Sequence, residues 1–503
     1  MIRRFAAALM FTSLLTAAVP AAAQDKGAPK KEAPAPKKSD DSDLPPLPAD
    51  RTVRQQAVIG GRSIAYDATV GTIPVRDAKG KIAGEVVFTA YTMPGAARGS
   101  RPVTFAFNGG PGASSVYLNL GAIGPKRVQF GAQGDSPSDS PVLTDNPASW
   151  LDFTDIVFID PVGTGFSRSL VDEEQTKKLF YSAKPDIEYL SRVIYDWLLR
   201  NGRLTSPKYL AGESYGGYRV PRVAYHLQSQ LGVGLNGLVL VSPYLDPTAL
   251  RAQGTALSPL PYMATLPSMA AANLERKGQL SPAALQEVED YTRGEYIVDL
   301  LRGRSDPAAV ERLTTRVSAY TGLDPKIVRQ LQGRVDLGTF LREIHRGEKK
   351  IGSVYDSNVT AYDPFPEKAD SDSNDPILDA LIAPTTSAMV DFVTTTVGWK
   401  VDARYNALSY DVNRMWVRDN SDTPVQDLRK AMAADPKMRV IVAHGMDDLS
   451  CPFFASRLII DQLPVMGDPN RVKLSLYAGG HMFYSRPASG QAFREDIRGM
   501  MAR

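Results

Sequence analysis

Cysteine is nearly absent from this chain of 503 residues, because Cys451 is the single one, and an intramolecular disulfide bond is therefore impossible. An excess of charge of either sign is also missing, since 58 lysine and arginine residues face 55 acidic residues and leave a formal net charge of +3. Because the basic and acidic residues are nearly equal in number, the charge gives no reason to expect nucleic acid as a partner. Hydrophobic residues make up 43% of the chain, which is ample for a buried core. We expect a globular protein whose stability depends on packing.

A run of apolar residues long enough to anchor the chain in a membrane is missing at the N-terminus. The apolar run of residues 5–19 is short for a membrane span, follows two arginines and ends at three alanines. This is the pattern of a secretory signal peptide, so we predict that residues 1–23 are a signal peptide and that the protein is exported, periplasmic or secreted, without a stable membrane anchor. Residues 24–50 are rich in Pro, Lys, Ala, Asp and Ser and are predicted to be a disordered linker.

The pattern of apolar residues predicts two kinds of strand. Short alternating stretches at 63–70, 72–77 and 81–93 are separated by turn residues and indicate antiparallel hairpins. Further along, the strands become continuously apolar, which is typical of a mostly parallel sheet buried on both faces. Helices with apolar residues at three and four spacing are predicted between them, so the sequence indicates an α/β fold with a doubly wound sheet. The continuously apolar strands are expected at 102–108, 154–160, 208–212, 235–242, 438–445 and 472–480, and the helices at 187–200 and 425–433.

The strand rhythm stops for a long stretch in the second half of the chain. From residue 246 to about residue 420 the sequence is mostly helical and polar, which indicates an insertion. We therefore predict a core built from residues 51–245 and 421–503, with residues 246–420 forming a largely helical cap between its two parts. A cap that shapes a pocket is the functional interpretation, and an elaboration that only adds stability is the alternative.

A serine lies between two glycines at the end of one of the apolar strands. In Gly212-Glu213-Ser214-Tyr215-Gly216 the spacing is that of a nucleophile elbow, a sharp turn from a strand into a helix that exposes the serine. The residues two before and two after the serine lack a Cβ because one would clash with the strand and the helix. An ordinary glycine turn is the alternative.

A serine nucleophile needs a base, and the chain offers four histidines. His226 falls on the helix that the elbow would begin, and His345 falls in a charged part of the insertion, so both are predicted to lie on the surface. His444 ends an apolar strand and is predicted to be structural. His481 follows the last strand in a glycine-flanked loop, where a doubly wound hydrolase sheet presents its histidine, and we predict that it is the base.

The base needs a carboxylate that orients it, which in this fold lies between the serine and the histidine in the chain. Two aspartates follow the penultimate strand. Asp448 has the expected offset in its turn, whereas Asp447 could instead cap the helix that begins near Pro452. We predict a triad of Ser214, Asp448 and His481, in the chain order of α/β hydrolases.

Backbone N–H groups must stabilise the negative oxygen that forms during acyl transfer. The turn Asn108-Gly109-Gly110-Pro111-Gly112 leaves an early strand, and the N–H groups of Gly110 and Tyr215 are predicted to form this oxyanion hole. A phosphate-binding turn is the alternative, but the turn lacks the glycine spacing of such sites. The predicted reaction requires no metal or cofactor.

Five segments of the chain carry a further signal, and they are, in order, Asn108 to Ser115, Pro161 to Ser167, Gly212 to Gly217 with Val220-Pro221, Gly445 to Pro452, and Gly480-His481-Met482. In the same order they resemble the signature blocks of the serine carboxypeptidase family, peptidase family S10. The resemblance implies an α/β-hydrolase fold and a serine-type carboxypeptidase that releases C-terminal residues from peptides through an acyl-enzyme intermediate. It further implies that Asn108, Gly109 and Glu213 bind the C-terminal carboxylate of the substrate, with Glu213 protonated so that it donates a hydrogen bond.

The chain departs from the family pattern near the predicted carboxylate site. Ala106 stands where the family commonly has tryptophan, and Ala122 stands where it usually has a second glutamate. We therefore expect a smaller proton-sharing network around Glu213. Phe483-Tyr484 replaces Val-Pro and is expected to alter the pocket wall, and Cys451 is either a free thiol near the site or an inert buried residue. An esterase or acyltransferase that uses the same triad, and a non-catalytic envelope binding protein on this scaffold, are the alternative functions.

Overall fold

The computed structural model describes residues 44–95, 99–129, 137–138, 140–246, 258–368, 374–418 and 424–502. The predicted signal peptide and most of the predicted linker lie outside the described residues. Residues 41–503 form one compact unit, and it contains all of the described residues.

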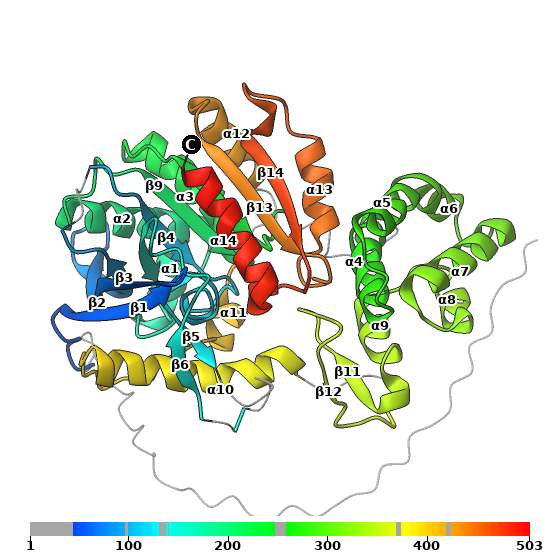
Figure 1. Ribbon diagram of the computed structural model, residues 1–503, viewed down its shortest axis with the longest axis horizontal. Coiled ribbons are helices and arrows are strands. Elements are labelled where there is room, and N and C mark those ends of the chain that lie inside the picture. The colour runs from blue at the N-terminus through cyan, green and yellow to red at the C-terminus, as the bar shows by residue number, and fades with distance from the viewer. Residues whose placement is uncertain are drawn as a thin grey trace, which may run out of the picture. The chain divides into compact units, whose positions relative to one another are not determined.

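A central sheet of ten strands organises this unit (Figure 1), in the order β1-β2-β3-β7-β4-β9-β10-β13-β14, with β8 (Arg168–Ser169) paired to β3. Each of the first three strands is antiparallel to its neighbour, β3 is antiparallel to β7, and the strands from β7 to β14 are parallel. The strands are β1 (Arg51–Ile59), β2 (Arg62–Arg76), β3 (Ile82–Thr92), β4 (Val103–Phe107), β7 (Asp155–Ile159), β9 (Lys208–Glu213), β10 (Gly237–Val241), β13 (Arg439–Gly445) and β14 (Val472–Tyr477).

All six continuously apolar strands are therefore confirmed and are mutually parallel. One prediction about the hairpins was wrong, because the stretches at 63–70 and 72–77 form a single strand, β2, of 15 residues. The turn expected at Gly71 is absent because that residue continues the pairing with β3, opposite Phe88. A Cβ at Gly71 would lie 2.7 Å from the Phe88 ring, so the glycine allows close packing within the strand.

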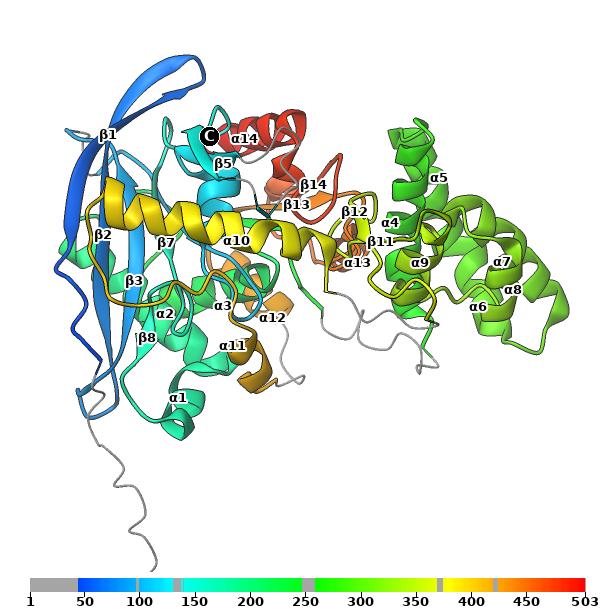
Figure 2. The same ribbon diagram turned by 90° about the horizontal axis from the view of Figure 1, so that it is seen from below.

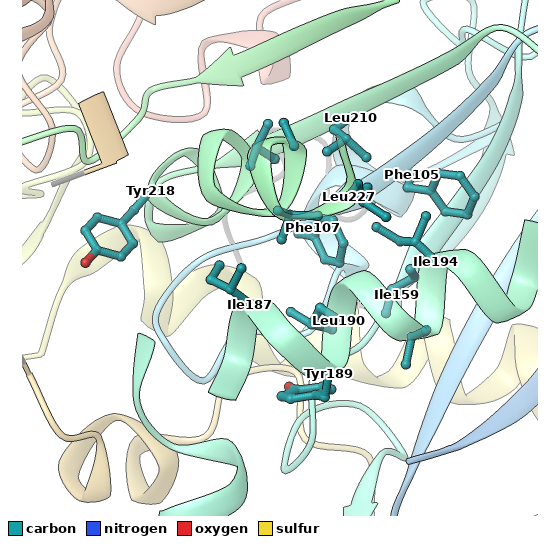
Figure 3. Close-up of a cluster of buried hydrophobic side chains, with 14 of the residues drawn as sticks. Phe105, Phe107, Ile159, Ile187, Tyr189, Leu190, Ile194, Leu210, Tyr218 and Leu227 are labelled. Carbon is teal, nitrogen blue, oxygen red and sulfur yellow. The ribbon is translucent and has the colours of Figure 1, made fainter. Parts of the chain in front are cut away.

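Successive residues of the parallel strands belong to two hydrophobic clusters on opposite faces of the sheet. On β4, Phe105 and Phe107 lie in the first cluster, whereas Ala106 lies in the second. The first cluster also contains the apolar faces of α2 and α3 (Figure 3), and the second contains residues of α14. Figure 2 shows α14 on one side of the sheet and α2, α3 and α12 on the other, as the period-two alternation of strand side chains requires. The helices are α1 (Glu173–Phe180), α2 (Ala183–Arg200), α3 (Tyr215–Gln230), α12 (Pro424–Ala434), α13 (Phe453–Asp461) and α14 (Pro487–Met501).

Between β10 and β13 the described chain is mostly helical. Residues 247–257 and 419–423, near the two ends of the predicted cap, lie outside the described residues. Helices α4 to α9 share a hydrophobic cluster of their own, to which Leu449 of the core also belongs. The helices of this segment are α4 (Leu260–Arg276), α5 (Pro282–Tyr291), η3 (Thr292–Tyr296), α6 (Ile297–Arg302), α7 (Pro307–Thr321), α8 (Pro325–Leu331), α9 (Leu337–Glu343), η4 (Arg346–Glu348), α10 (Pro376–Asp391), η5 (Phe392–Thr396) and α11 (Tyr410–Met415), and its strands are β11 (Lys350–Gly352) and β12 (Thr360–Tyr362).

The later part of this segment packs on the sheet. Ala388 and Met389 of α10 and Phe392 and Val393 of η5 belong to the second cluster. The stretch Pro376–Thr396 is long and apolar enough to cross a membrane by length and composition, but a core helix of a soluble protein passes the same test. The remaining elements are η1 (Leu118–Ile123), β5 (Lys126–Gln129), β6 (Val142–Asp145), η6 (Pro469–Arg471) and η7 (Phe483–Ser485).

Candidate active site

Ser214 lies at the junction of β9 and α3, with a φ of 59° and a ψ of −121°. A positive φ is strained for a residue with a side chain, and such strain is typical of functional turns. Both flanking glycines are sterically required there, since a Cβ on Gly212 would lie 2.2 Å from the carbonyl oxygen of Gly216. A Cβ on Gly216 would lie 2.6 Å from the carbonyl oxygen of Phe107. The segment forms a strained strand-to-helix turn, not an ordinary glycine turn.

His481 and Asp448 contact each other beyond the ends of β14 and β13. Nδ1 of His481 lies 2.8 Å from Oδ2 of Asp448, and both side chains are buried. Oδ1 of Asp448 accepts hydrogen bonds of 2.9 Å from the N–H groups of Ser450 and Cys451, so the carboxylate has a fixed orientation. Burial opposes a charge on His481, but the adjacent Asp448 carboxylate outweighs it and raises the pKa of His481. An imidazole held in this way can accept a proton.

The other histidines lie apart from this contact. His444 is buried in β13, its Nε2 lies 2.8 Å from Oγ of Ser456, and burial lowers its pKa to about 3. His226 is half-buried on α3. The prediction of a surface position for His345 was wrong, because only 7% of the residue is exposed and its Nε2 lies 2.8 Å from the carbonyl oxygen of Ser357. Its charged sequence neighbours gave no sign of the loop that covers it.

The alternative role for Asp447, as the cap of α13, is wrong. The N-cap of that helix is Pro452, and no side chain hydrogen-bonds to its first turn. Asp447 is instead completely buried, 3.8 Å from Nη2 of Arg486. Of the two aspartates, Asp448 is the one within hydrogen-bonding distance of His481.

The glycine-rich turn after β4 packs directly against the elbow. A Cβ on Gly109 would lie 2.5 Å from the backbone nitrogen of Tyr215 and 2.8 Å from Cβ of Ser214. Gly110 has a φ of 97°, which glycine adopts without strain. Gly109, Gly110, Ser214 and Tyr215 therefore all line the same cavity, together with His481.

Glu213 lies beside Ser214 with its carboxyl group buried and both oxygens hydrogen-bonded. Nδ2 of Asn108 donates to Oε2, and the hydroxyl group of Tyr484 donates to Oε1 over 2.7 Å. The amide of Asn108 is itself oriented, because its Oδ1 accepts a hydrogen bond of 2.9 Å from the N–H of Leu118. Burial raises the pKa of Glu213 to about 7, although His481, Tyr484 and Asn108 favour its charged form. This carboxyl group changes its charge near neutral pH.

The sequence did not reveal that Tyr484 contacts Glu213. Its expected effect was on the pocket wall, yet its hydroxyl group bonds to Glu213. Its ring lies against η1, since a Cβ on Gly121 would be 3.4 Å from Cε2 of Tyr484. The neighbouring Ala122 is also buried. The sequence did contain one indication of this contact, because a small residue at position 122 leaves room for a tyrosine at position 484 to reach Glu213.

The cavity has a volume of about 310 Å³, and its wall combines aromatic, aliphatic and polar residues. Among its lining residues, Glu213 and Arg418 are the charged ones besides His481, and Cys451 also contributes to the lining. Within the described parts of the chain, no group of three or more His, Cys, Asp and Glu side chains could hold a metal ion. The aromatic lining residues are Tyr117, Tyr215, Tyr218, Tyr244, Tyr355 and Trp416.

The model of the serine carboxypeptidase family, Peptidase_S10, matches residues 85–481. The chain belongs to this family. Serine carboxypeptidase-like 36 of Arabidopsis thaliana is 30% identical over 208 residues, which cover 40% of this chain and 39% of that protein. The pheromone-processing carboxypeptidase KEX1 of Ogataea parapolymorpha is 31% identical over 195 residues, which cover 38% of this chain and 27% of that protein. The chain thus spans less than two fifths of the length of these curated relatives.

A solved structure agrees with the fold. The crystal structure of the prohormone-processing carboxypeptidase KEX1 from Saccharomyces cerevisiae superposes with a TM-score of 0.55 at 18% identity, and covers 86% of this chain and 91% of its own. Together with the mostly parallel sheet covered by helices on both faces, this likeness shows that this serine carboxypeptidase family member has the α/β-hydrolase fold.

Proposed function

We propose that the chain is a serine-type carboxypeptidase that releases C-terminal residues from peptides through an acyl-enzyme intermediate. The single observation that carries the proposal is the buried Glu213, hydrogen-bonded by Asn108 and Tyr484 directly beside Ser214. An acid that retains its proton near neutral pH can donate a hydrogen bond to a carboxylate, whereas an ester or an internal peptide bond needs no such group.

In the proposed acylation, Oγ of Ser214 attacks the carbonyl carbon of the last peptide bond while His481 accepts the hydroxyl proton. Asp448 orients the imidazole and stabilises its positive charge. The N–H groups of Gly110 and Tyr215 stabilise the oxyanion. The C–N bond then breaks, His481 passes its proton to the leaving amino group, and a water molecule later cleaves the ester to Ser214.

The C-terminal carboxylate would be bound by Asn108, Gly109 and protonated Glu213. Sharing one proton between two acids is favourable because two adjacent carboxylates in a buried site repel each other. Since the pKa of Glu213 is about 7, binding of the carboxylate should weaken as the pH rises above that value. Tyr484 would then serve as the partner of Glu213 in place of the second glutamate that is common in the family.

Two further parts of the chain, a helical segment beside the pocket and the N-terminal residues, have roles in the proposed function. The helical segment from α4 to β12 would act as a cap over the pocket, since Tyr355 contributes to the pocket wall. Residues 1–23 would direct export, which fits a substrate class of peptides outside the cytoplasm.

The test compares an N-blocked dipeptide with its C-terminal amide, at pH 6, using the purified protein and its Ser214→Ala variant. The proposed function predicts that the free acid is cleaved at least about tenfold faster than the amide and that the variant is inactive. Equal turnover of acid and amide would point to an esterase or acyltransferase with the same triad. Unchanged turnover in the variant would contradict serine catalysis altogether.

A further inference from the structure

Residues 353–358, which we term the strap, join β11 to β12 and hydrogen-bond to both loops of the candidate triad. The N–H of His481 donates to the carbonyl oxygen of Tyr355 over 2.6 Å. The N–H of Leu449, next to Asp448, donates to the carbonyl oxygen of Val354 over 3.1 Å. The rings of Tyr355 and His481 also meet edge to face, with centroids 5.1 Å apart. The strap therefore contacts His481 through both its backbone and its ring.

Asp356 extends this contact to the residue before the histidine. Its Oδ2 accepts hydrogen bonds from the N–H of Gly480, over 3.1 Å, and from Nη2 of Arg486, over 2.9 Å. Gly480 leaves no room for a side chain, because a Cβ would lie 1.9 Å from the carbonyl oxygen of Tyr355. The loop that carries His481 is thus pressed against the strap, and a shift of the strap would shift that loop.

Arg486 connects the strap to α4. Its guanidinium group also binds the carboxylate of Glu275, in the last turn of α4, with an Nη2 to Oε2 distance of 3.1 Å. Oε2 of Glu275 accepts a second hydrogen bond, of 2.9 Å, from Nδ2 of Asn358 at the end of the strap. Arg276, the next residue, donates to Oδ1 of Asn358 over 2.7 Å.

A third carboxyl group, that of Asp447, lies in this cluster without a full cationic partner. It is completely buried, and apart from carboxyl groups no donor among the described residues hydrogen-bonds to its oxygens. Arg486, 3.8 Å away, already binds Glu275 and Asp356. The carboxyl groups of Asp447 and Glu275 lie within hydrogen-bonding reach of each other. Two carboxylates cannot form such a bond unless one of them carries a proton.

We propose that Asp447 is a positioning residue whose protonated carboxyl group donates a hydrogen bond to Glu275, and that this bond, with the ion pairs of Arg486, holds the strap against the loops of Asp448 and His481. Asp356 and Asp447 are buried and Glu275 is half-buried, and three such carboxyl groups around one guanidinium cannot all be ionised at low cost, so one retains its proton. Asp447 is that group because it is the most buried and has the most distant cation. Burial raises its pKa well above the usual range, with Glu275 and Asp356 adding to the effect and Arg486 opposing it. Burial opposes the charge of Glu275 too, but the hydrogen bonds from Arg486 and Asp447 outweigh it and lower the pKa of Glu275 to about 2.

The proton on Asp447 can be tested by stability alone, without any activity. A carboxyl group that binds its proton more tightly when folded stabilises the fold fully below the unfolded pKa near 4, and this stabilisation is lost as the pH rises. The Asp447→Asn variant does not titrate, yet its amide N–H can still donate to Glu275. Its midpoint of thermal unfolding, relative to that of the unmodified protein, should therefore rise by on the order of a few degrees between pH 5 and pH 8.5.

An Asp447 that is ionised and paired with Arg486 would titrate below pH 5 in both the folded and the unfolded state, so the difference in midpoint between the two proteins would stay constant from pH 5 to pH 8.5. A constant difference, or one that falls as the pH rises, would overturn the proposal. Asp461→Asn is the matched control, because Asp461 of α13 forms a 2.8 Å ion pair with Arg293 of η3 at the exposed surface. It should show no such dependence on pH beyond that of an exposed pair.

The effect on catalysis rests on the proposed function and is tested on an ester that lacks a free carboxylate, so that Glu213 is not involved. Asp356→Ala removes the acceptor shared by Gly480 and Arg486, and kcat should fall by about tenfold or more with KM changed by less than about twofold, because a displaced base lowers the rate without altering binding. Asp356→Asn keeps an acceptor oxygen and should recover part of the loss, and Asp461→Asn should leave kcat unchanged. Full kcat in Asp356→Ala would overturn the positioning role. If the unmodified protein hydrolyses no ester, it is the proposed function that fails, whereas the unfolding experiment still tests the proton.

Discussion

The hydroxyl group of Tyr484 donates a hydrogen bond of 2.7 Å to Oε1 of Glu213, and both residues are almost fully buried. This contact joins two segments that are 271 residues apart in the chain. A donor directed at a carboxyl oxygen favours the ionised form, so Tyr484 limits the rise in the pKa of Glu213 that burial causes. The pH range in which Glu213 carries a proton therefore depends on Tyr484.

Replacing Tyr484 with Phe should raise the pKa of Glu213 above its present value of about 7. The ionised form loses a donor in the variant, while burial continues to oppose the charge. For a peptide with a free C-terminus, the alkaline decline of kcat/KM should move to higher pH by roughly 0.5 to 1 unit. The profile for the corresponding C-terminal amide should not move. A decline at unchanged pH for the free acid would show that Tyr484 does not tune this group.

Replacing Glu213 with Gln should remove the same decline. The amide group of Gln donates a hydrogen bond at every pH, whereas Glu213 loses its donor proton near pH 7. At pH 8.5 we expect kcat/KM of the variant for a free acid to exceed that of the unmodified protein, even if it is lower at pH 5.5. The amide substrate is again the control. If both proteins lose activity in parallel above pH 7, the decline arises from another group.

The parts of this structure that the sequence predicted are those set by neighbours along the chain. Burial on both faces of a strand appears as a continuous apolar run, and all six parallel strands were found in this way. The elbow was found because the steric requirement at Gly212 and Gly216 is local. The hairpin strand β2 was divided in error because Gly71 is a turn residue by composition but packs against Phe88 across the sheet.

The parts that the sequence did not predict depend on distant segments. The contact of Tyr484 with Glu213 needs the loop after β14 to return to the end of β9. The burial of His345 depends on a loop that folds back over a segment whose own residues are mostly charged. The position of Asp447 depends on Glu275 and Arg486, which lie on opposite sides of it in the sequence. No local pattern encodes such meetings, because tertiary packing decides them.

The two adjacent aspartates should respond differently to the same substitution. Asp448→Asn places an amide against Nδ1 of His481, so the imidazole loses its charged partner and its favoured tautomer, and kcat should fall by about 10³-fold to 10⁴-fold. Asp447→Asn should retain kcat within about threefold at pH 6, because its amide can replace a protonated carboxyl group. Steady-state rates of both variants on one peptide substrate provide the measurement. Equal losses of kcat in the two variants would mean that neither aspartate alone is the carboxylate that orients His481.

Adding a methyl group to Gly212 should disrupt the elbow itself. The new Cβ would lie 2.2 Å from the carbonyl oxygen of Gly216 and 2.6 Å from a methyl carbon of Val220, and both belong to the packed junction of β9 with α3. Overpacking at a rigid backbone contact costs about 1 to 3 kcal/mol or more, and here it would also displace Ser214. We expect Gly212→Ala to unfold at a lower denaturant concentration and to lose reactivity with a fluorophosphonate probe. Gly232→Ala is a control at an open position, since a Cβ there meets no atom within 4 Å, although its φ of +66° adds a modest strain of its own. A Gly212→Ala protein as stable and as reactive as this control would contradict the steric account of the elbow.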